Sequence, residues 1–219
     1  MAKITWAGQS CFQISVSGSK DNSADIVIDP YDEATGLKLP NFSSDILLVT
    51  HNHHDHNNIK GVKGDPFVVQ GPGEYEIKGV FIKGIPSFHD NKDGKEKGQN
   101  TIYTIDAEDM RFCHLGDLGQ NELSPEQLDK IGQVDILMIP VGGAGYTISS
   151  TEAVKIVGQI EPRIVIPMHY ALPKLEMDID DVSKFLKAIG KPSVAAQDKL
   201  TIKASTLPKE GMEIAVLQP

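Results

Sequence analysis

The chain has 219 residues and a formal net charge of −9, with 40% hydrophobic and 23% charged residues, as in an ordinary globular protein. This acidic balance argues against a protein whose main work is to grip a nucleic-acid backbone. No apolar run approaches the length of a membrane helix, and residues 1–5 are typical of a strand rather than a signal segment, so we expect a cytoplasmic protein. Two cysteines are too few for a disulfide framework, and Cys11 and Cys113 are expected to be buried thiols.

The first half of the chain is predicted to consist almost wholly of strands. Short apolar or alternating runs, separated by turn residues, indicate this structure. The expected strands cover residues 4–7, 12–16, 26–28, 45–49, 66–69, 80–85, 101–105 and 110–113. Residues 17–23 are predicted to form a turn, and residues 71–76, where two glycines flank a proline, a tight turn.

Helix signals begin only near residue 124. Capping boxes that start at Ser124 and Ser149 predict one helix from Pro125 and another that ends near Ile160. An apolar stripe predicts a third helix over residues 180–189. The remaining strands are expected at residues 136–141, 164–166, 200–203 and 212–217. In this order of elements, strands come first and strands alternate with helices afterwards. The order predicts a single α/β domain over residues 1–219, with two sheets packed together and helices outside.

The turn after strand 45–49 contains the motif H-x-H-x-D-H. The motif supplies His51, His53, Asp55 and His56 within six residues. Neutral imidazoles and carboxylates are the ligands of zinc and its first-row neighbours. Because a loop at the end of a buried strand holds its side chains on a rigid support, the motif predicts a metal site. The alternative is a His-rich surface tract with incidental metal affinity.

Other predicted strands also end near a residue that can bind a metal. His89, Asp117 and His169 each follow an apolar run. Strand ends that share one edge of a layered fold converge on one site, so these residues and the motif can supply two metals and a shared water. Asp29 ends strand 26–28, where it either supports a ligand histidine from behind or is an ordinary turn aspartate.

Eight segments in the chain resemble the metallo-β-lactamase superfamily. Within it, the chain is most similar to the small branch of uncharacterised metal-dependent hydrolases related to ascorbate-6-phosphate lactonase. The matching segments are 8–10, 28–30, 51–56, 71–74, 88–89, 116–117, 139–143 and 167–170. The resemblance implies a four-layer αβ/βα sandwich with the site at one edge.

The resemblance also implies how the candidate ligands divide between two metals. The expected ligands are His51, His53 and His89 for site one, Asp55, His56 and His169 for site two, and Asp117 as the bridge. The chain departs from the family pattern in two places. Relatives often carry His where this chain has Gln9, and the third motif lacks the Gly-His form, which leaves His114 as the alternative to His89.

The expected cofactor is a pair of divalent cations, zinc first, with manganese, iron or nickel as alternatives. Such a pair is expected to turn a bridging water into a hydroxide nucleophile and to polarise the bond under attack. Asp55 and Asp117 are the expected catalytic carboxylates, Asp55 by orienting the hydroxide or by passing a proton to the leaving group. The predicted reaction is hydrolysis of a small ester, lactone or phosphoester.

Two other functions use the same residues. One is a phosphodiesterase or nuclease acting on RNA or a cyclic nucleotide, and the other is a non-hydrolytic metal-binding or redox module. The expected partner is a small-molecule substrate, with nucleic acid disfavoured, no membrane and the oligomeric state left open. Lys92, Lys95 and Lys97 follow His89, so they either steer an anionic substrate towards the site or belong to a solvated loop.

Overall fold

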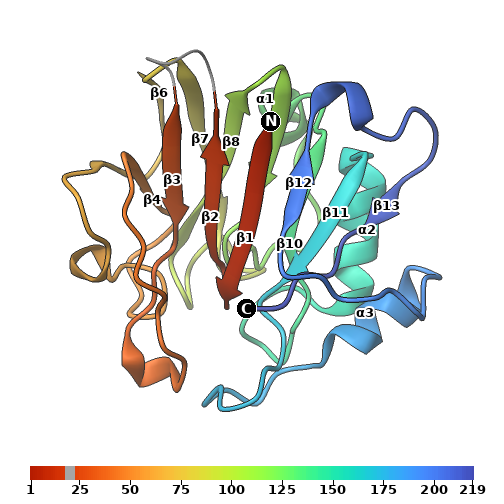
Figure 1. Cartoon of the computed structure of the whole chain (residues 1–219). Helices are drawn as coiled ribbons and strands as arrows, with labels where there is room; N and C mark the ends of the chain where they lie inside the picture. Colours follow the sequence, from red (N-terminus) through yellow and green to blue (C-terminus); the bar gives the residue numbers. More distant parts are fainter. Residues whose placement is uncertain (18–22) are drawn as a thin grey trace.

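The computed structural model describes residues 1–17 and 23–219, which form two β-sheets packed face to face (Figure 1). Most of the predicted turn 17–23 lies outside the described residues. The first sheet has the order β12-β1-β2-β3-β4-β5. Its strands are β1 (Ala2–Gly8), β2 (Cys11–Val16), β3 (Ala24–Ile28), β4 (Ile46–Val49), β5 (Phe67–Gln70) and β12 (Leu200–Ile202).

The second sheet has the order β13-β11-β10-β9-β8-β7-β6. Its strands are β6 (Gly73–Ile77), β7 (Val80–Phe88), β8 (Gln99–Ala107), β9 (Met110–His114), β10 (Ile136–Pro140), β11 (Ile164–Met168) and β13 (Glu213–Ile214). Strands β3, β4 and β5 run parallel in the first sheet, and β9, β10, β11 and β13 run parallel in the second. The carboxyl ends of parallel neighbours share an edge, so polar residues that follow them are brought close together.

Three α-helices in the described part of the chain follow strands β9, β10 and β11 of the second sheet. They are α1 (Pro125–Ile131), α2 (Ser150–Ile160) and α3 (Val182–Ala188). Both predicted capping boxes are present, at Ser124 and Ser149, and Asp181 caps α3, which is shorter than predicted. The apolar side of α2 joins the main core through Ala153, Ile156 and other buried residues.

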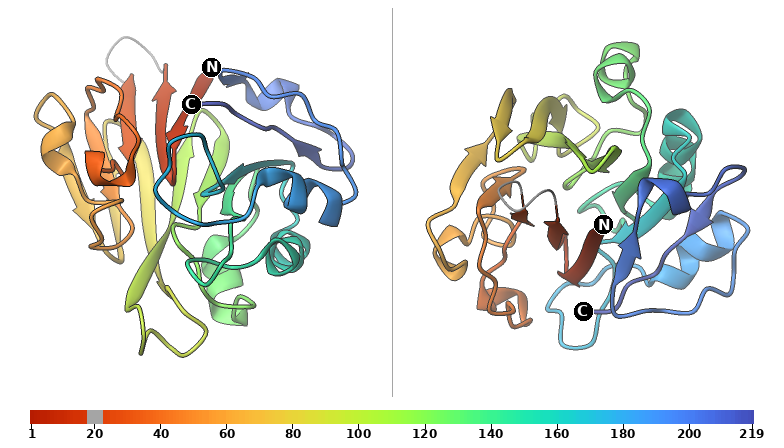
Figure 2. Two further views of the ribbon diagram at one scale, coloured as in Figure 1. Left: turned by 90° about the horizontal axis from the view of Figure 1, so that it is seen from below. Right: turned by 45° about the horizontal axis from the view of Figure 1, so that its top comes forward.

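A different covering layer lies on the outer face of the first sheet. It consists of the two segments that precede and follow β4, residues 29–45 and 50–66, with two short 3-10 helices, η1 (Glu33–Thr35) and η2 (Ile59–Gly61). Both views in Figure 2 place these orange segments away from the helices. The layer packs a second apolar cluster, with Tyr31 and Phe42 against Val27 and Leu47 of the sheet. The α/β sandwich predicted from the sequence is confirmed.

The main core lies between the two sheets. In β3 and β4, Ile26, Ile28 and Leu48 face this core, while Val27 and Leu47 face the outer layer. Strands that are buried on both faces have continuous apolar sequences. The strands β3 and β4 could therefore be predicted although apolar and polar residues do not alternate in them. Cys11 and Cys113 are buried free thiols, as predicted. In the described part of the chain, no helix is both long and apolar enough to span a bilayer.

The prediction of a tight turn over residues 71–76 is wrong from residue 73 onward. Only Gly71 and Pro72 turn, where the chain leaves β5 of the first sheet and enters β6 of the second. Glu74 alternates with the half-buried Tyr75, the pattern of an edge strand with one face in solvent. Similarly, β7 extends through Pro86 to Phe88, while the last predicted strand shortens to Glu213–Ile214.

Candidate metal centre

The loop after β4 carries the first residues of the candidate metal centre. A buried carboxylate at the end of β3 fixes the shape of this loop. Asp29 accepts hydrogen bonds from the Thr50 backbone N–H at 2.8 Å and the Thr50 hydroxyl at 2.7 Å. Its Oδ2 atom is also 3.0 Å from Nδ1 of His56. This contact leaves Nε2 of His56 directed away from Asp29, so the prediction that Asp29 supports a candidate ligand histidine is confirmed.

The first cluster of possible ligand atoms comprises His51, His53 and His89, which offer atoms within 4.8 Å of one another. His51 and His89 are buried, whereas His53 is exposed. The three ring centroids are separated by 4.5–5.1 Å. The threonine hydroxyl of Thr50 lies 3.0 Å from Nδ1 of His51, which leaves the Nε2 atom of that ring for the cluster.

The second cluster consists of four buried residues within the same mutual distance: Asp55, His56, Asp117 and His169. Asp117 connects it to the first cluster. Its Oδ2 atom is 3.2 Å from Nε2 of His56, 3.3 Å from Nε2 of His169 and 3.5 Å from Nε2 of His89. One carboxylate oxygen thus lies beside histidines of both clusters, which is where a bridging ligand has to lie.

All seven predicted ligands are therefore brought together, and they divide between the clusters as expected. The motif residues come from the end of the first sheet, while His89, Asp117 and His169 follow β7, β9 and β11 of the second. In Figure 1 the orange segment after β3 and the cyan segment after β11 both lie at the lower edge, where these strands end. That each residue binds a metal stays a prediction.

The arrangement leaves polar atoms without partners. Among the described residues, Nε2 of His51, His56 and His169 is buried and makes no hydrogen bond, although Asp117 lies close by. Buried polar groups are almost always satisfied in folded proteins. A cation between these ring nitrogens and the carboxylates would satisfy all of them, so the residues present fit a metal.

Burial and mutual charge set the protonation of these groups. Burial, helped by the neighbouring His56, lowers the pKa of His51 to about 2. Its ring is therefore neutral at pH 7, the form that binds a metal. Burial opposes the charged forms of His56 and Asp117. Even so, the carboxylates of Asp117 and Asp29 raise the pKa of His56 well above its usual value, while His169 and His56 hold the pKa of Asp117 well below its own.

His114, the alternative to His89, lies outside both clusters. Its Nε2 atom is 2.9 Å from the Ser10 carbonyl, and its Nδ1 accepts from the Gly116 backbone N–H at 3.1 Å. Burial lowers the pKa of His114, and its ring packs edge-on against Phe12. As the last residue of β9, His114 points into the sandwich, so it is a satisfied core histidine.

Two residues that support Asp117 received no role from the sequence. The Ser10 hydroxyl donates to Oδ1 of Asp117 at 3.0 Å. Asn100 accepts from the Asp117 backbone N–H at 3.1 Å and donates to the Leu115 carbonyl at 2.9 Å. An asparagine within an apolar strand is unfavourable unless its amide is used, and that signal could have identified Asn100. Gln9, at a position where relatives often carry His, is buried with its amide 2.8 Å from the Met177 sulfur.

The loop after His89 is held by one carboxylate. Asp90 accepts four backbone hydrogen bonds of 2.8–2.9 Å, and burial acts against this charge while the bonds lower the pKa of Asp90 to about 2. The four donors are Lys92, Gly94, Glu96 and Lys97. The lysine-bearing segment is therefore an ordered loop beside His89.

Comparison with known proteins agrees with this geometry. A model of the β-lactamase superfamily domain matches residues 3–169. The chain is 33% identical to a UPF0173 protein of Pyrococcus abyssi, over 77% of this chain and 83% of that one. It is 26% identical to a UPF0173 metal-dependent hydrolase of Methanopyrus kandleri, over 86% and 93% of the two chains.

Solved structures show the same likeness. A Thermotoga maritima protein assigned to the Zn-dependent hydrolases of the metallo-β-lactamase superfamily matches with a TM-score of 0.78 and 33% identity, over 99% of both chains. CmlA, a diiron β-hydroxylase of Streptomyces venezuelae, matches with a TM-score of 0.63 but 18% identity over 54% of its own length, which shows the fold alone. The chain therefore belongs to the metallo-β-lactamase superfamily and, within it, to the UPF0173 family of metal-dependent hydrolases.

Proposed function

We propose that the protein binds two divalent cations, zinc in the first place, and hydrolyses a small ester, lactone or phosphoester. The observation that carries the proposal is the pair of adjacent clusters with Asp117 between them and with unpaired ring nitrogens facing inward. Seven side chains suit two ions with three or four ligands each. Manganese, iron and nickel accept the same ligand types.

A bound pair of cations would lower the pKa of water and polarise the carbonyl or phosphoryl group under attack. The protein's own residues would supply the fixed orientation and the charge that the reaction also needs. Asp117 is held by Ser10 and by the Asn100 side chain, so its carboxylate keeps one orientation. Burial acts to raise the pKa of Asp55, but the nearby His56, with its Nε2 atom 3.5 Å from Oδ2 of Asp55, lowers that pKa, and Asp55 stays ionised at neutral pH.

Asp55 is placed to move a proton. Its Oδ1 atom is 4.0 Å from Nδ1 of His54, a side chain that is 64% exposed, while its Oδ2 atom faces His56. A proton taken up by Asp55 would pass outward to His54 and solvent through one intervening water, since 4.0 Å is too long for a direct hydrogen bond. A general acid or base with such an outlet can act again in the next turnover.

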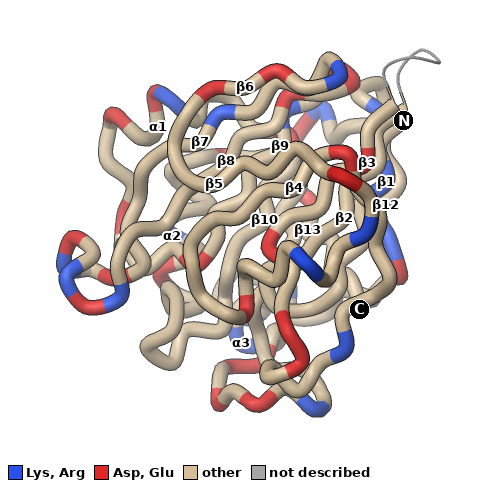
Figure 3. The backbone as a smooth tube through the Cα atoms, turned by 90° about the vertical axis from the view of Figure 1, so that its left-hand side faces the viewer, with Lys and Arg blue, Asp and Glu red and all other residues tan. Residues whose placement is uncertain are grey.

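The distribution of charge supports a small substrate over RNA. Figure 3 shows Lys and Arg interspersed with Asp and Glu along the described chain. Together with the net charge of −9, this does not match the basic stripe that a nucleic-acid backbone requires. A cleft of about 540 Å³ beside His51 and His53 has the size of a small-molecule site.

The test compares wild type with His53→Ala and Asp117→Ala after zinc loading. Elemental analysis is expected to give two ions per wild-type chain and fewer in both variants. Hydrolysis of a panel of esters, lactones and phosphodiesters is expected to fall at least 100-fold in both, because the groups that position the reaction are lost. Equal rates in all three proteins would contradict the proposal.

A further inference from the structure

Two glycines near the metal centre are packed against the backbones of candidate ligand histidines. A β-carbon added to Gly119 would lie 2.3 Å from the carbonyl carbon and oxygen of His89 and 2.4 Å from the Asp90 nitrogen. A β-carbon added to Gly142 would lie 2.2 Å from the His169 carbonyl oxygen. Real β-carbons essentially never come closer than 3.0 Å to other atoms, so each histidine backbone occupies the space that a side chain would need.

Glycine is needed at these two positions because of the contact and not because of the backbone conformation. Neither Gly119 nor Gly142 has a positive φ, whereas Gly116 and Gly143 have φ values of 56° and 57°. The φ values of Gly119 and Gly142 therefore do not exclude a side chain. What excludes it is the close approach of a second segment of backbone.

The contact of Gly119 sets the distance between a ligand of the first cluster and the carboxylate between the clusters. Gly119 follows Asp117 closely in the chain, and its backbone N–H donates to the Phe88 carbonyl at 2.9 Å. The side chain of the next residue, Gln120, accepts from the Phe88 backbone N–H at 3.0 Å. Both polar backbone groups of Phe88 are thus held by the segment that carries Asp117. This hold keeps Nε2 of His89 at 3.5 Å from Oδ2 of Asp117.

The contact of Gly142 acts on the second cluster in the same way. Gly142 follows β10, and His169 follows its parallel neighbour β11. His169 has a positive φ of 51°, which is strained for a residue with a side chain, and its N–H donates to the Gln9 carbonyl at 3.0 Å. The carbonyl of Gly142 accepts from the Asp180 N–H at 2.8 Å. The His169 backbone is therefore bonded to Gln9 and packed against a glycine that is itself held in place.

We propose that Gly119 and Gly142 are positioning residues, each for one metal site. Gly119 places His89 in the first cluster, and Gly142 places His169 in the second. The inference rests on the proposed binding of two cations. To accept a β-carbon at Gly119, the two backbones would have to separate by about 0.7 Å, whereas metal–ligand distances vary by only about 0.2 Å. An added methyl group therefore displaces one ligand histidine and leaves the other cluster as it was.

The test uses isotopically enriched cadmium as the probe, because cadmium NMR gives a separate signal for each bound ion. Two reference variants assign the signals: His53→Ala should lose the signal of the first cluster, and Asp55→Ala that of the second. Gly119→Ala is expected to raise the cadmium Kd of the first cluster about 10–100-fold, with loss of its signal alone. Gly142→Ala is expected to do the same at the second cluster alone.

A milder variant covers the case in which Gly119→Ala does not fold. Gln120→Leu adds no β-carbon but removes the acceptor of the Phe88 N–H, and should raise the cadmium Kd of the first cluster about tenfold. Gly84→Ala is the matched control. A β-carbon there would lie 2.7 Å from the Gly71 carbonyl oxygen, again without a positive φ, so the variant should lose stability and keep both signals. Equal loss of a signal in Gly84→Ala would overturn the proposal.

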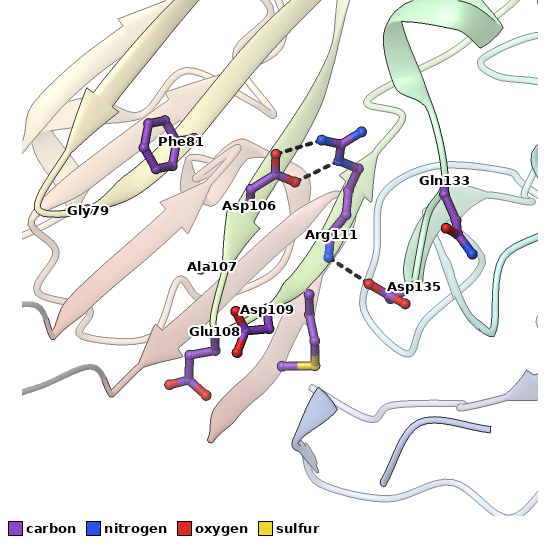
Figure 4. A pocket seen from close by; sticks show the side chains of 10 residues that line it. Gly79, Phe81, Asp106, Ala107, Glu108, Asp109, Arg111, Gln133 and Asp135 are labelled. Carbon is purple, nitrogen blue, oxygen red and sulfur yellow. Dashed lines mark hydrogen bonds and ion pairs between the residues drawn. The ribbon is translucent and has the colours of Figure 1, made fainter. Parts of the chain in front are cut away.

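Carboxylates away from the metal centre have to be kept out of the cadmium count. Several line a hollow of about 550 Å³ at the hairpin between β8 and β9 (Figure 4). Asp106 accepts two hydrogen bonds from the Arg111 guanidinium, and Asp135 accepts from the Arg111 backbone N–H at 2.8 Å. These partners weaken the hollow as a cation site relative to the clusters. Asp109→Asn identifies any signal that comes from it.

The outcomes separate this proposal from the hydrolase function. If each glycine variant loses a different signal and wild type hydrolyses no ester, the hydrolase function fails while the roles of the glycines stand. Wild-type signals and Kd values in both glycine variants, or loss of both signals in each, would overturn the proposal and leave the hydrolase function untouched. Fewer than two signals from the clusters of wild type would overturn it as well.

Discussion

At the scale of single residues, the site depends on side chains that hold the candidate ligands in place. Asp29 has a positive φ of 48°, a conformation that few residues other than glycine adopt, and it is fully buried. Its two oxygens accept from Thr50 and face His56. A carboxylate behind an imidazole fixes the ring's orientation and strengthens it as a ligand.

The substitution Asp29→Asn tests this role. The amide keeps one acceptor but places an N–H₂ group against either the Thr50 N–H or the His56 ring, so a buried donor loses its partner. We expect zinc affinity, measured by competition with a chelator, to fall about 10–100-fold. Asp129→Asn, an exposed change on α1, is the control. Wild-type zinc affinity in Asp29→Asn would show that the carboxylate does not act through His56.

The candidate ligands could be predicted where they lie close together along the sequence. His51, His53, Asp55 and His56 lie within one short motif that no ordinary surface loop requires. The roles of Ser10, Asn100 and Asp90 could not be predicted, because each depends on contacts with backbone groups that only the folded chain brings near. The choice of His89 over His114 depended likewise on which strand end points out of the sandwich.

At the scale of elements, the loop between β7 and β8 connects the metal centre to the cleft of about 540 Å³ beside His51 and His53. It begins at His89, carries Lys97 and returns to β8 at Gln99. Four backbone N–H groups converge on Asp90, which replaces the hydrogen bonds that a strand or helix would give. Backbone hydrogen bonds from His89 to Gly98 and from Gly98 to Gly94 also hold the loop, and the Asp90 side chain adds the four bonds that order its middle.

Asp90→Asn should loosen the loop. A single amide oxygen cannot accept the bonds that two carboxylate oxygens accept, and the amide N–H₂ group would face N–H donors. We expect hydrogen exchange of the backbone amides of residues 92–97, followed by NMR, to accelerate on the order of tenfold or more. Asp93→Asn is the control, since that side chain is exposed and on the same loop. Unchanged exchange in Asp90→Asn would contradict this account.

Elements with strong local signals were predicted well. The capping boxes at Ser124 and Ser149 placed the starts of α1 and α2 because the signal is local to four residues. Residues 71–76 were mispredicted for the opposite reason. Gly71 and Pro72 do turn, but the strand that follows is specified by residues outside this segment, since it pairs with β7 in a hairpin that turns at Lys78 and Gly79.

At the scale of the whole molecule, the two clusters join the two sheets. The motif after β4 belongs to the first sheet, and His89, Asp117 and His169 follow strands of the second. A cation bound in either cluster therefore connects the sheets at one edge. Binding to the folded state alone increases its stability by mass action.

Removal of metal by EDTA should lower the melting temperature. Zinc at 100 times its Kd would add about 2.7 kcal/mol to the free energy of unfolding. For a chain of this length that corresponds to roughly 5–11 °C. Calorimetry of the zinc-loaded and EDTA-treated protein measures the difference, and Asp117→Ala should show a smaller one. Identical melting temperatures with and without zinc would mean that these side chains bind no ion.

The hydroxyl of Tyr103 has a consequence for how the cleft beside His51 and His53 selects its ligands. Tyr103 lies on β8 of the second sheet, yet its hydroxyl donates to the Val49 carbonyl at 2.9 Å and accepts from the Gly71 backbone N–H at 3.0 Å. Val49, Gly71 and Thr101 all line that cleft. These hydrogen bonds thus connect the walls of the cleft before any ligand binds. We therefore expect lock-and-key recognition, in which the cleft binds ligands that match its width and length and changes its conformation little on binding.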